Sequence, residues 1–218
     1  MTEKFHHNLK DFLKSVMQMG QFATDMLTNS VIALKEQNLE LAERVHDQKD
    51  ILAEMDEKIE QHALKLLTLY QPMAIDIRTI GASLKTITYI TRIGRYGKDI
   101  AKATLDLGKE SHIAKVVTIP IMEKEVNQMI QDALNAYDSG DLSNIDPGSF
   151  SERDDSIDAQ RYSIFRECLT YMMEDPKNIT RCANYIMIAR YLERCGDHAC
   201  KIAEKVHYMV TGKRVEIN

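Results

Sequence analysis

The sequence contains few of the residues that interrupt helices. Its 218 residues include nine Gly, four Pro and no Trp, and aromatic residues make up 6% of the chain. So few turn formers argue against a β protein with many turns and favour long, uninterrupted helices. Twelve Met supply flexible side chains for a core that has few aromatic rings.

Segments that direct a chain into or across a membrane are also missing. No apolar run approaches the roughly 18 residues that a bilayer-spanning helix needs. The N-terminal sequence MTEKFHHNLKDFLK lacks the apolar stretch of a signal peptide. We therefore expect a cytoplasmic protein that is at most peripheral to a membrane.

Charge and cysteine content narrow the function classes further. The net charge is -5, from 28 Lys and Arg against 33 Asp and Glu, so no overall positive field attracts nucleic acid. The four cysteines contain no C-x-x-C motif and all lie in the second half, at Cys168, Cys182, Cys195 and Cys200. We expect them to be small buried apolar residues rather than a disulfide framework or a zinc site.

Apolar residues recur at helical spacing along nearly the whole chain. The pattern predicts an all-α protein of six helices. Their expected extents are up to about residue 35, 39–70, 75–107, from about 120 to a linker at 138–149, from that linker to about 174, and 179–211. Gly212 then follows as a helix-ending residue.

The third and sixth predicted helices carry a similar sequence. Residues 92–101 (RIGRYGKDIA) align with residues 194–203 (RCGDHACKIA), and Tyr89 matches Tyr191 at the same offset of 102 residues. Chance likeness between two amphipathic helices is one explanation. The shared sequence pattern, the proline that precedes each of these two helices and the equal number of helices in each half favour a tandem duplication of a three-helix unit, with repeats at 1–108 and 109–218.

Two pairs of acidic residues lie on the last two predicted helices. Asp154 and Asp158 are four residues apart on one helix, and Glu193 and Asp197 are four apart on the next. Asp158 precedes Pro176 by 18 residues and Glu193 follows it by 17. An antiparallel hairpin about Pro176 therefore places the four carboxylates at one height, where they need cations nearby.

Two kinds of cation could balance these charges. One is a metal ion bound by carboxylate oxygens: His198 as an additional nitrogen donor suits iron, zinc or manganese, and without it magnesium or calcium fits. The other is a set of ordinary ion pairs with the neighbouring arginines, each worth about 0–1 kcal/mol. Those arginines are Arg153, Arg161, Arg190 and Arg194.

Three segments resemble a known family. Residues 192–198 (LERCGDH) are similar to the L-E-R-I-G-D-H signature of the PhoU family, whose members are accessory regulators of phosphate-specific transport. Residues 171–175 (YMMED) and 71–78 (QPMAIDIR) resemble family segments at their expected places. The similarity covers nearly the whole chain, including both repeats.

The resemblance implies two tandem three-helix bundles that bind multinuclear iron or zinc clusters through E(D)-x-x-x-D motifs. Carried onto this chain, the ligands are Asp154, Asp158, Glu193 and Asp197. The first repeat departs from the pattern: Asp56 and Glu60 remain, but Thr91 and Arg95 stand where the family carries carboxylates. We expect this first site to be degenerate and Arg95 to pair with Asp56 or Glu60.

The family likeness also implies a function. It indicates a negative regulator that contacts the ATPase of a phosphate ABC transporter and, where one exists, a phosphate-sensing histidine kinase. The sequence has no phosphate-binding loop, dinucleotide fingerprint or nucleophile elbow, which agrees with a protein that is not an enzyme. We expect a homodimer formed through exposed Met- and Leu-bearing helix faces.

Alternative functions rest on other features. Two E-x-x-H motifs, Glu43 to His46 and Glu204 to His207, have the spacing of di-iron carboxylate oxidoreductases, although they lie in different repeats. A helical scaffold without metal is the second alternative. A basic stripe on the third helix is either a solvated face or a docking surface for an acidic partner or anionic lipid. It comprises Arg78, Lys85, Arg92 and Lys98.

Overall fold

Helices make up the regular structure of the chain. The computed structural model describes residues 2–109, 111–113 and 118–217, and in these ranges it contains no strand. The α-helices are α1 (Thr2–Glu36), α2 (Leu39–Asp47), α3 (Lys49–Tyr70), α4 (Ala74–Leu107), α5 (Thr118–Ser139), α6 (Pro147–Glu174) and α7 (Ile179–Thr211), and short 3₁₀ turns form η1 (Ser143–Ile145) and η2 (Pro176–Asn178). The predicted all-α fold is confirmed. Nowhere in the described chain does a helix combine the length and the hydropathy that crossing a membrane requires.

Several helices begin or end at the glycine, proline and capping residues in the sequence. Gly212 follows α7 with a φ of 74°, and its N–H donates to the Tyr208 carbonyl at 2.9 Å. This left-handed conformation suits glycine, so α7 ends where the sequence predicts. At the start of α6, the Asp146 carboxylate accepts the N–H of Ser149 at 3.1 Å and Pro147 occupies the first turn.

Two expected boundaries differ from those observed. The helix predicted over 39–70 is divided at Gln48, whose N–H bonds to the Val45 carbonyl three residues back at 3.2 Å. This tight turn contains no glycine or proline, so the sequence has no marker for a break in the helix. The expected linker at 138–149 is shorter, because α5 extends to Ser139 and α6 begins at Pro147. Of the expected connection after Gly108, residues 110 and 114–117 lie outside the described residues.

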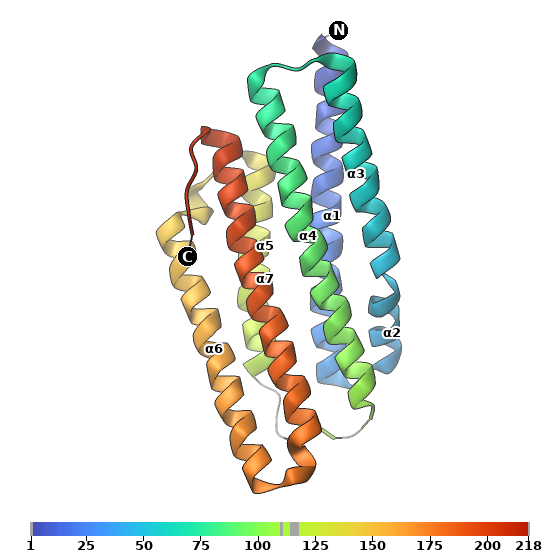
Figure 1. Cartoon of the computed structure of the whole chain (residues 1–218), viewed down its shortest axis with the longest axis vertical. Helices are drawn as coiled ribbons and strands as arrows, with labels where there is room; N and C mark the ends of the chain where they lie inside the picture. The colour runs from blue at the N-terminus through green and yellow to red at the C-terminus, as the bar shows by residue number, and fades with distance from the viewer. Residues whose placement is uncertain (1, 110, 114–117, 218) are drawn as a thin grey trace.

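The helices form two bundles that lie side by side (Figure 1). In the first, α1 packs against α2, α3 and α4, and in the second, α7 packs against α5 and α6. The bundles meet where α4 packs on α7 and α1 packs on α5. The turn between α3 and α4 and the turn between α6 and α7 lie at opposite ends of the long axis (Figure 1). The two bundles therefore run in opposite directions.

Glycines on α4 and on α7 allow close approach of helices within both bundles. A Cβ atom on Gly97 of α4 would lie 2.9 Å from the backbone carbon of Met26 on α1. A Cβ atom on Gly196 of α7 would lie 3.1 Å from Ile157 and 3.2 Å from the carboxylate of Asp154, both on α6. Bare backbone at Gly196 thus leaves the space into which Asp154 leans.

Candidate functional site

The α6–α7 hairpin brings the four predicted acidic residues together. Asp154 and Asp158 lie on α6, and Glu193 and Asp197 lie on the antiparallel α7. The pKa of Asp154 is raised to about 6, first by burial and then by the charges of Asp197, Asp158 and Glu193. A carboxyl group that is partly desolvated beside three carboxylates is difficult to ionise. The expected gathering of negative charge is therefore present in the structure.

Glu193 is the most enclosed member of the group. Its side chain is 10% exposed, and its Oε1 atom accepts a hydrogen bond from Arg190 at 3.1 Å. Burial and the charge of Asp197 raise its pKa, and Arg190 and Arg194 oppose that rise. Its Oε2 atom is buried without a hydrogen-bond partner. One carboxylate oxygen at the centre of the cluster therefore retains an unused acceptor capacity.

Arginines neutralise the carboxylates of α7. Arg161 lies 3.8 Å and Arg194 3.6 Å from Glu193, and Arg194 also contacts Asp197 at 2.9 Å. The fourth arginine expected here, Arg153, turns instead to Asp132 on α5, at 2.8 Å. Within the residues that the structure describes, Asp154 and Asp158 have no ion-pair partner. The α6 side of the pocket is consequently short of positive charge.

The donor set fits a cation in chemistry and charge. Carboxylate oxygens are ligands for hard divalent ions and for iron, and Glu193 Oε2, 3.6 Å from Arg194, accepts no hydrogen bond. In the described part of the chain, no three His, Cys, Asp or Glu side chains already converge as a ready-made metal site. The observed side-chain rotamers are those of an arginine–carboxylate network. Metal binding would require Arg190 and Arg194 to swing away.

The side chain of His198 packs against α4, whereas the acidic cluster lies between α6 and α7. Its ring stacks on Tyr96 of α4, with centroids 5.9 Å apart, and contacts Tyr89 at 5.7 Å. Burial, with the nearby charges of Arg92 and Arg194, lowers its pKa to about 4. The structure thus places this nitrogen donor candidate at the contact between the bundles, among rings of α4.

The first repeat contains a weaker counterpart of the acidic pocket. Burial raises the pKa of Asp56 on α3, and Glu60 adds to that effect. The hydroxyl of Thr91 and the more distant charge of Arg95 lower it. Among the described residues, no ion pair within 4 Å joins Arg95 to either acid, so the expected direct salt bridge does not form. Arg95 acts on Asp56 through space instead.

The two E-x-x-H motifs do not assemble into one centre. The first lies on α2 in one bundle, where His46 contacts Asp47 at 3.2 Å. In the second, on α7, Glu204 is buried against Lys201 and Lys205, and His207 contacts Thr211 at 3.2 Å. The two motifs belong to different bundles (Figure 1), so they provide no shared di-iron site.

Part of the basic stripe on α4 faces cations of the second repeat, a relationship that apolar periodicity does not reveal. Arg78 and Lys85 line a groove together with Lys201, Lys205 and Arg214. The other two members of the stripe are elsewhere: Arg92 acts on His198, and Lys98 pairs with Asp99 at 2.7 Å. Lys201 and Lys205 near the end of α7 and Arg214 beyond it were the available signal, but which helix they face depends on how the bundles dock.

Comparisons with known proteins agree along the full chain. The family model described as the PhoU domain matches twice, at residues 16–104 and 119–206. A "Phosphate-specific transport system accessory protein PhoU homolog" of Clostridium acetobutylicum is 33% identical over 100% of both chains, and one of Rhizobium meliloti is 35% identical over 95% of this chain and 87% of its own.

Solved structures have the same fold. The crystal structure of PhoU from Pseudomonas aeruginosa matches with a TM-score of 0.89 at 32% identity, covering 96% of this chain and all of that one. The phosphate transport system regulatory protein PhoU from Streptococcus pneumoniae matches with a TM-score of 0.87 at 25% identity, covering 97% and 99% of the two chains.

Proposed function

Because the chain belongs to the PhoU family, we propose that it is a regulatory accessory protein of a phosphate-specific transport system. In this function it represses phosphate uptake and phosphate signalling when phosphate is plentiful, and it acts by binding other proteins rather than by catalysis. The observation that carries the proposal is likeness over the whole length to curated relatives of that description. The proposed location is the cytoplasm.

The proposed partners are the transporter ATPase, a phosphate-sensing histidine kinase where one exists, and a second copy of the chain. Support comes from apolar side chains exposed at both hairpin ends. Met73 and Ile75 beside the α3–α4 turn are 76% and 61% exposed, and Met173 beside the α6–α7 turn is 87% exposed. Exposed apolar groups of this size are typical of helix faces that dock to a partner.

A metal ion or cluster in the second repeat is part of the proposal. Its ligands are Asp154, Asp158, Glu193 and Asp197, and the metal is iron or zinc, with magnesium as the alternative. The absence of ion pairs at Asp154 and Asp158 supports it, as does the buried Glu193 oxygen that accepts no hydrogen bond. The first repeat binds none, because Thr91 and Arg95 replace two ligands.

Metal analysis of protein purified without a histidine tag tests this site. We expect bound metal in the wild type, and its loss in the double variant Asp154→Asn/Asp158→Asn. The matched control is Asp56→Asn/Glu60→Gln in the first repeat, which should retain the wild-type metal content. Metal that survives the first double change, or that is lost in the control, contradicts the assignment.

Binding to the transporter tests the regulatory role. We expect the purified chain to be captured by the ATPase subunit of its own host's phosphate transporter. Loss of the chain in that host should raise phosphate uptake in phosphate-rich medium. The variant Glu193→Ala/Asp197→Ala should weaken capture if the metal sets the charge and rigidity of the docking bundle. Absence of capture, together with unchanged uptake, would refute the role.

A further inference from the structure

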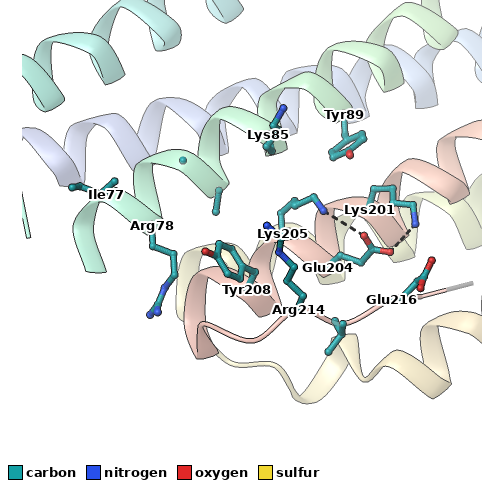
Figure 2. A pocket seen from close by; sticks show the side chains of 13 residues that line it. Ile77, Arg78, Lys85, Tyr89, Lys201, Glu204, Lys205, Tyr208, Arg214 and Glu216 are labelled. Atoms are coloured by element: carbon teal, nitrogen blue, oxygen red, sulfur yellow. Dashed lines mark hydrogen bonds and ion pairs between the residues drawn. The ribbon is translucent and has the colours of Figure 1, made fainter. Parts of the chain in front are cut away.

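A basic groove lies between the bundles, and none of the four acidic-pocket residues lines it. It has a volume of about 800 Å³, and its walls come from α4, from the last turns of α7, and from the segment 214–216 that follows (Figure 2). That segment is held in place because Ile217 is buried and its N–H donates to Glu204 at 3.2 Å. The groove therefore joins three separate parts of the chain.

Positive charge predominates along this groove. Five cationic side chains line it, against the two carboxylates of Glu204 and Glu216; the five are Arg78, Lys85, Lys201, Lys205 and Arg214. Glu204 is buried and already bound by Lys201 at 2.7 Å and by Lys205 at 3.4 Å, and Figure 2 shows it between these two lysines. Its charge is thus already balanced within the protein.

The remaining cations have no such balance. Within the described residues, neither Lys85 nor Arg214 pairs with a carboxylate. The hydrogen bond with Glu204 raises the pKa of Lys201, and the charge of Glu216 adds to that rise, so Glu216 acts at the Lys201 end of the groove. The end lined by Arg78, Lys85 and Arg214 is consequently positive, and it can accept an anion without displacing an internal ion pair.

Arg78 is held in position by the backbone of the second repeat. Its Nε atom donates to the carbonyl of Met209 in the last turn of α7, at 3.2 Å. The guanidinium also lies over Gly212, where any side chain would collide with it. An arginine fixed through Nε keeps terminal N–H groups for a ligand, and its planar fork suits phosphate oxygens.

The groove is larger than an inorganic ion needs, and part of its lining is apolar. Its volume lies within the range of about 300–1,000 Å³ that is typical of sites for organic ligands. Tyr89, Tyr208 and Ile77 contribute apolar surface beside the cations, and Arg214 lies over the Tyr208 ring at 5.9 Å. Cations from three segments around one space of this size match an organic molecule with several negative charges.

We propose that this groove binds a small organic anion carrying at least two phosphate groups, held by Arg78, Lys85 and Arg214. The site is distinct from the acidic pocket and goes beyond the regulatory function proposed above. Since its walls come from both repeats, an occupied groove ties α4 to α7. Bound ligand should therefore stabilise the docking of the two bundles.

Calorimetric titration of the full-length wild-type chain with ATP as the probe tests the proposal. We expect saturable binding of one equivalent that weakens as salt is added, because the cations are partly exposed. The charge reversals Lys85→Glu and Arg214→Glu should each weaken binding by about tenfold or more. The control Lys102→Glu, also exposed on α4 but outside the groove, should bind as the wild type does.

Two further probes identify the source of the phosphate groups. Inorganic phosphate should bind more weakly than ATP, and tighter binding of inorganic phosphate would overturn the requirement for an organic polyanion. Vesicles containing phosphatidylglycerol test a lipid headgroup: capture that ATP displaces supports the same site, and capture that ATP leaves unchanged counts against it. Absence of saturable ATP binding, or equal effects of Lys85→Glu and Lys102→Glu, would refute the proposal outright.

Discussion

The ring of Tyr96 on α4 stacks on the ring of Tyr191 on α7, with centroids 5.6 Å apart and planes 24° from parallel. Beside this pair, Tyr89 on α4 contacts His198 on α7 at 5.7 Å. Tyr191 lies 102 residues after Tyr89, and His198 lies 102 residues after Tyr96. Each contact is therefore the other with the repeats exchanged, as expected when duplicated units pack about an approximate twofold axis.

The stacked pair should contribute to the docking of the two bundles. We expect Tyr96→Ala and Tyr191→Ala each to lower the free energy of unfolding, and the double variant to lose less than their sum. The coupling should be about 0.5–1.5 kcal/mol, measured by urea unfolding in a double-mutant cycle. The control Tyr191→Phe keeps the ring, so its free energy of unfolding should stay close to that of the wild type. Strict additivity of the two alanine changes would show that the rings do not interact.

Gly97 and Gly81, both on α4, should respond in opposite ways to alanine. Gly97→Ala forces a Cβ atom to within 2.9 Å of the α1 backbone, which cannot move as a side chain end can. We expect a loss of about 1–3 kcal/mol in unfolding free energy. Nothing lies within 4 Å of a Cβ atom at Gly81, so alanine there should stabilise by about 0.5–1 kcal/mol. Thermal unfolding of both variants checks the prediction, and a neutral Gly97→Ala would contradict the close helix contact.

Asp154 should destabilise the metal-free protein at neutral pH. Its folded-state pKa of about 6 exceeds its ordinary value of 3.8, so the folded state binds the proton more tightly than the unfolded state does. This destabilisation is complete above the folded pKa and disappears as the pH falls towards the ordinary value. In chelator-treated protein, Asp154→Asn should therefore raise the unfolding free energy by about 1–2 kcal/mol near neutral pH, allowing for partial exposure.

The difference between Asp154→Asn and wild type should shrink to about zero near pH 4. His198 produces the opposite trend in the same range, because its lowered pKa makes the fold less stable as the pH falls. Only the difference between variant and wild type, measured by chemical unfolding at each pH, isolates the carboxylate. A difference that stays constant from neutral to acid pH would show that Asp154 is not perturbed.

The cysteines should react slowly in the folded protein. All four are free and buried, and burial raises the pKa of Cys168 to about 12. Since the thiolate is the reactive form, a chromogenic disulfide reagent should modify the native chain far more slowly than the unfolded chain. Full unfolding should release four equivalents of reactive thiol. Rapid labelling of any cysteine under native conditions would contradict the burial.

Much of the fold and of the acidic pocket could be predicted locally. Helix ends at Leu107, Glu174 and Thr211 were expected because proline, glycine and apolar spacing act over a few residues. The turn at Gln48 was missed, since it has no such marker. The proximity of Asp154 and Glu193 could be predicted because an antiparallel hairpin about Pro176 is enough to bring them together. The division of the chain at residue 108 and the metal role of the pocket remain predictions.

Partner choice among charged side chains required the tertiary structure. Arg153 turns to Asp132, His198 packs among tyrosines of α4, and Arg95 stays out of contact with Asp56. Each outcome depends on the rotation of one helix against another, which the core packing of both bundles sets together.

By itself, the sequence determined the helical class, the duplicated units and the family, because these rest on periodicity, spacing and residue identity within short stretches. Only the tertiary structure decided which faces meet between the bundles. It alone placed Arg78 beside Met209, 131 residues later, and created the basic groove. The physical reason is that docking of two amphipathic bundles depends on the summed fit of many side chains, and no local pattern contains that sum.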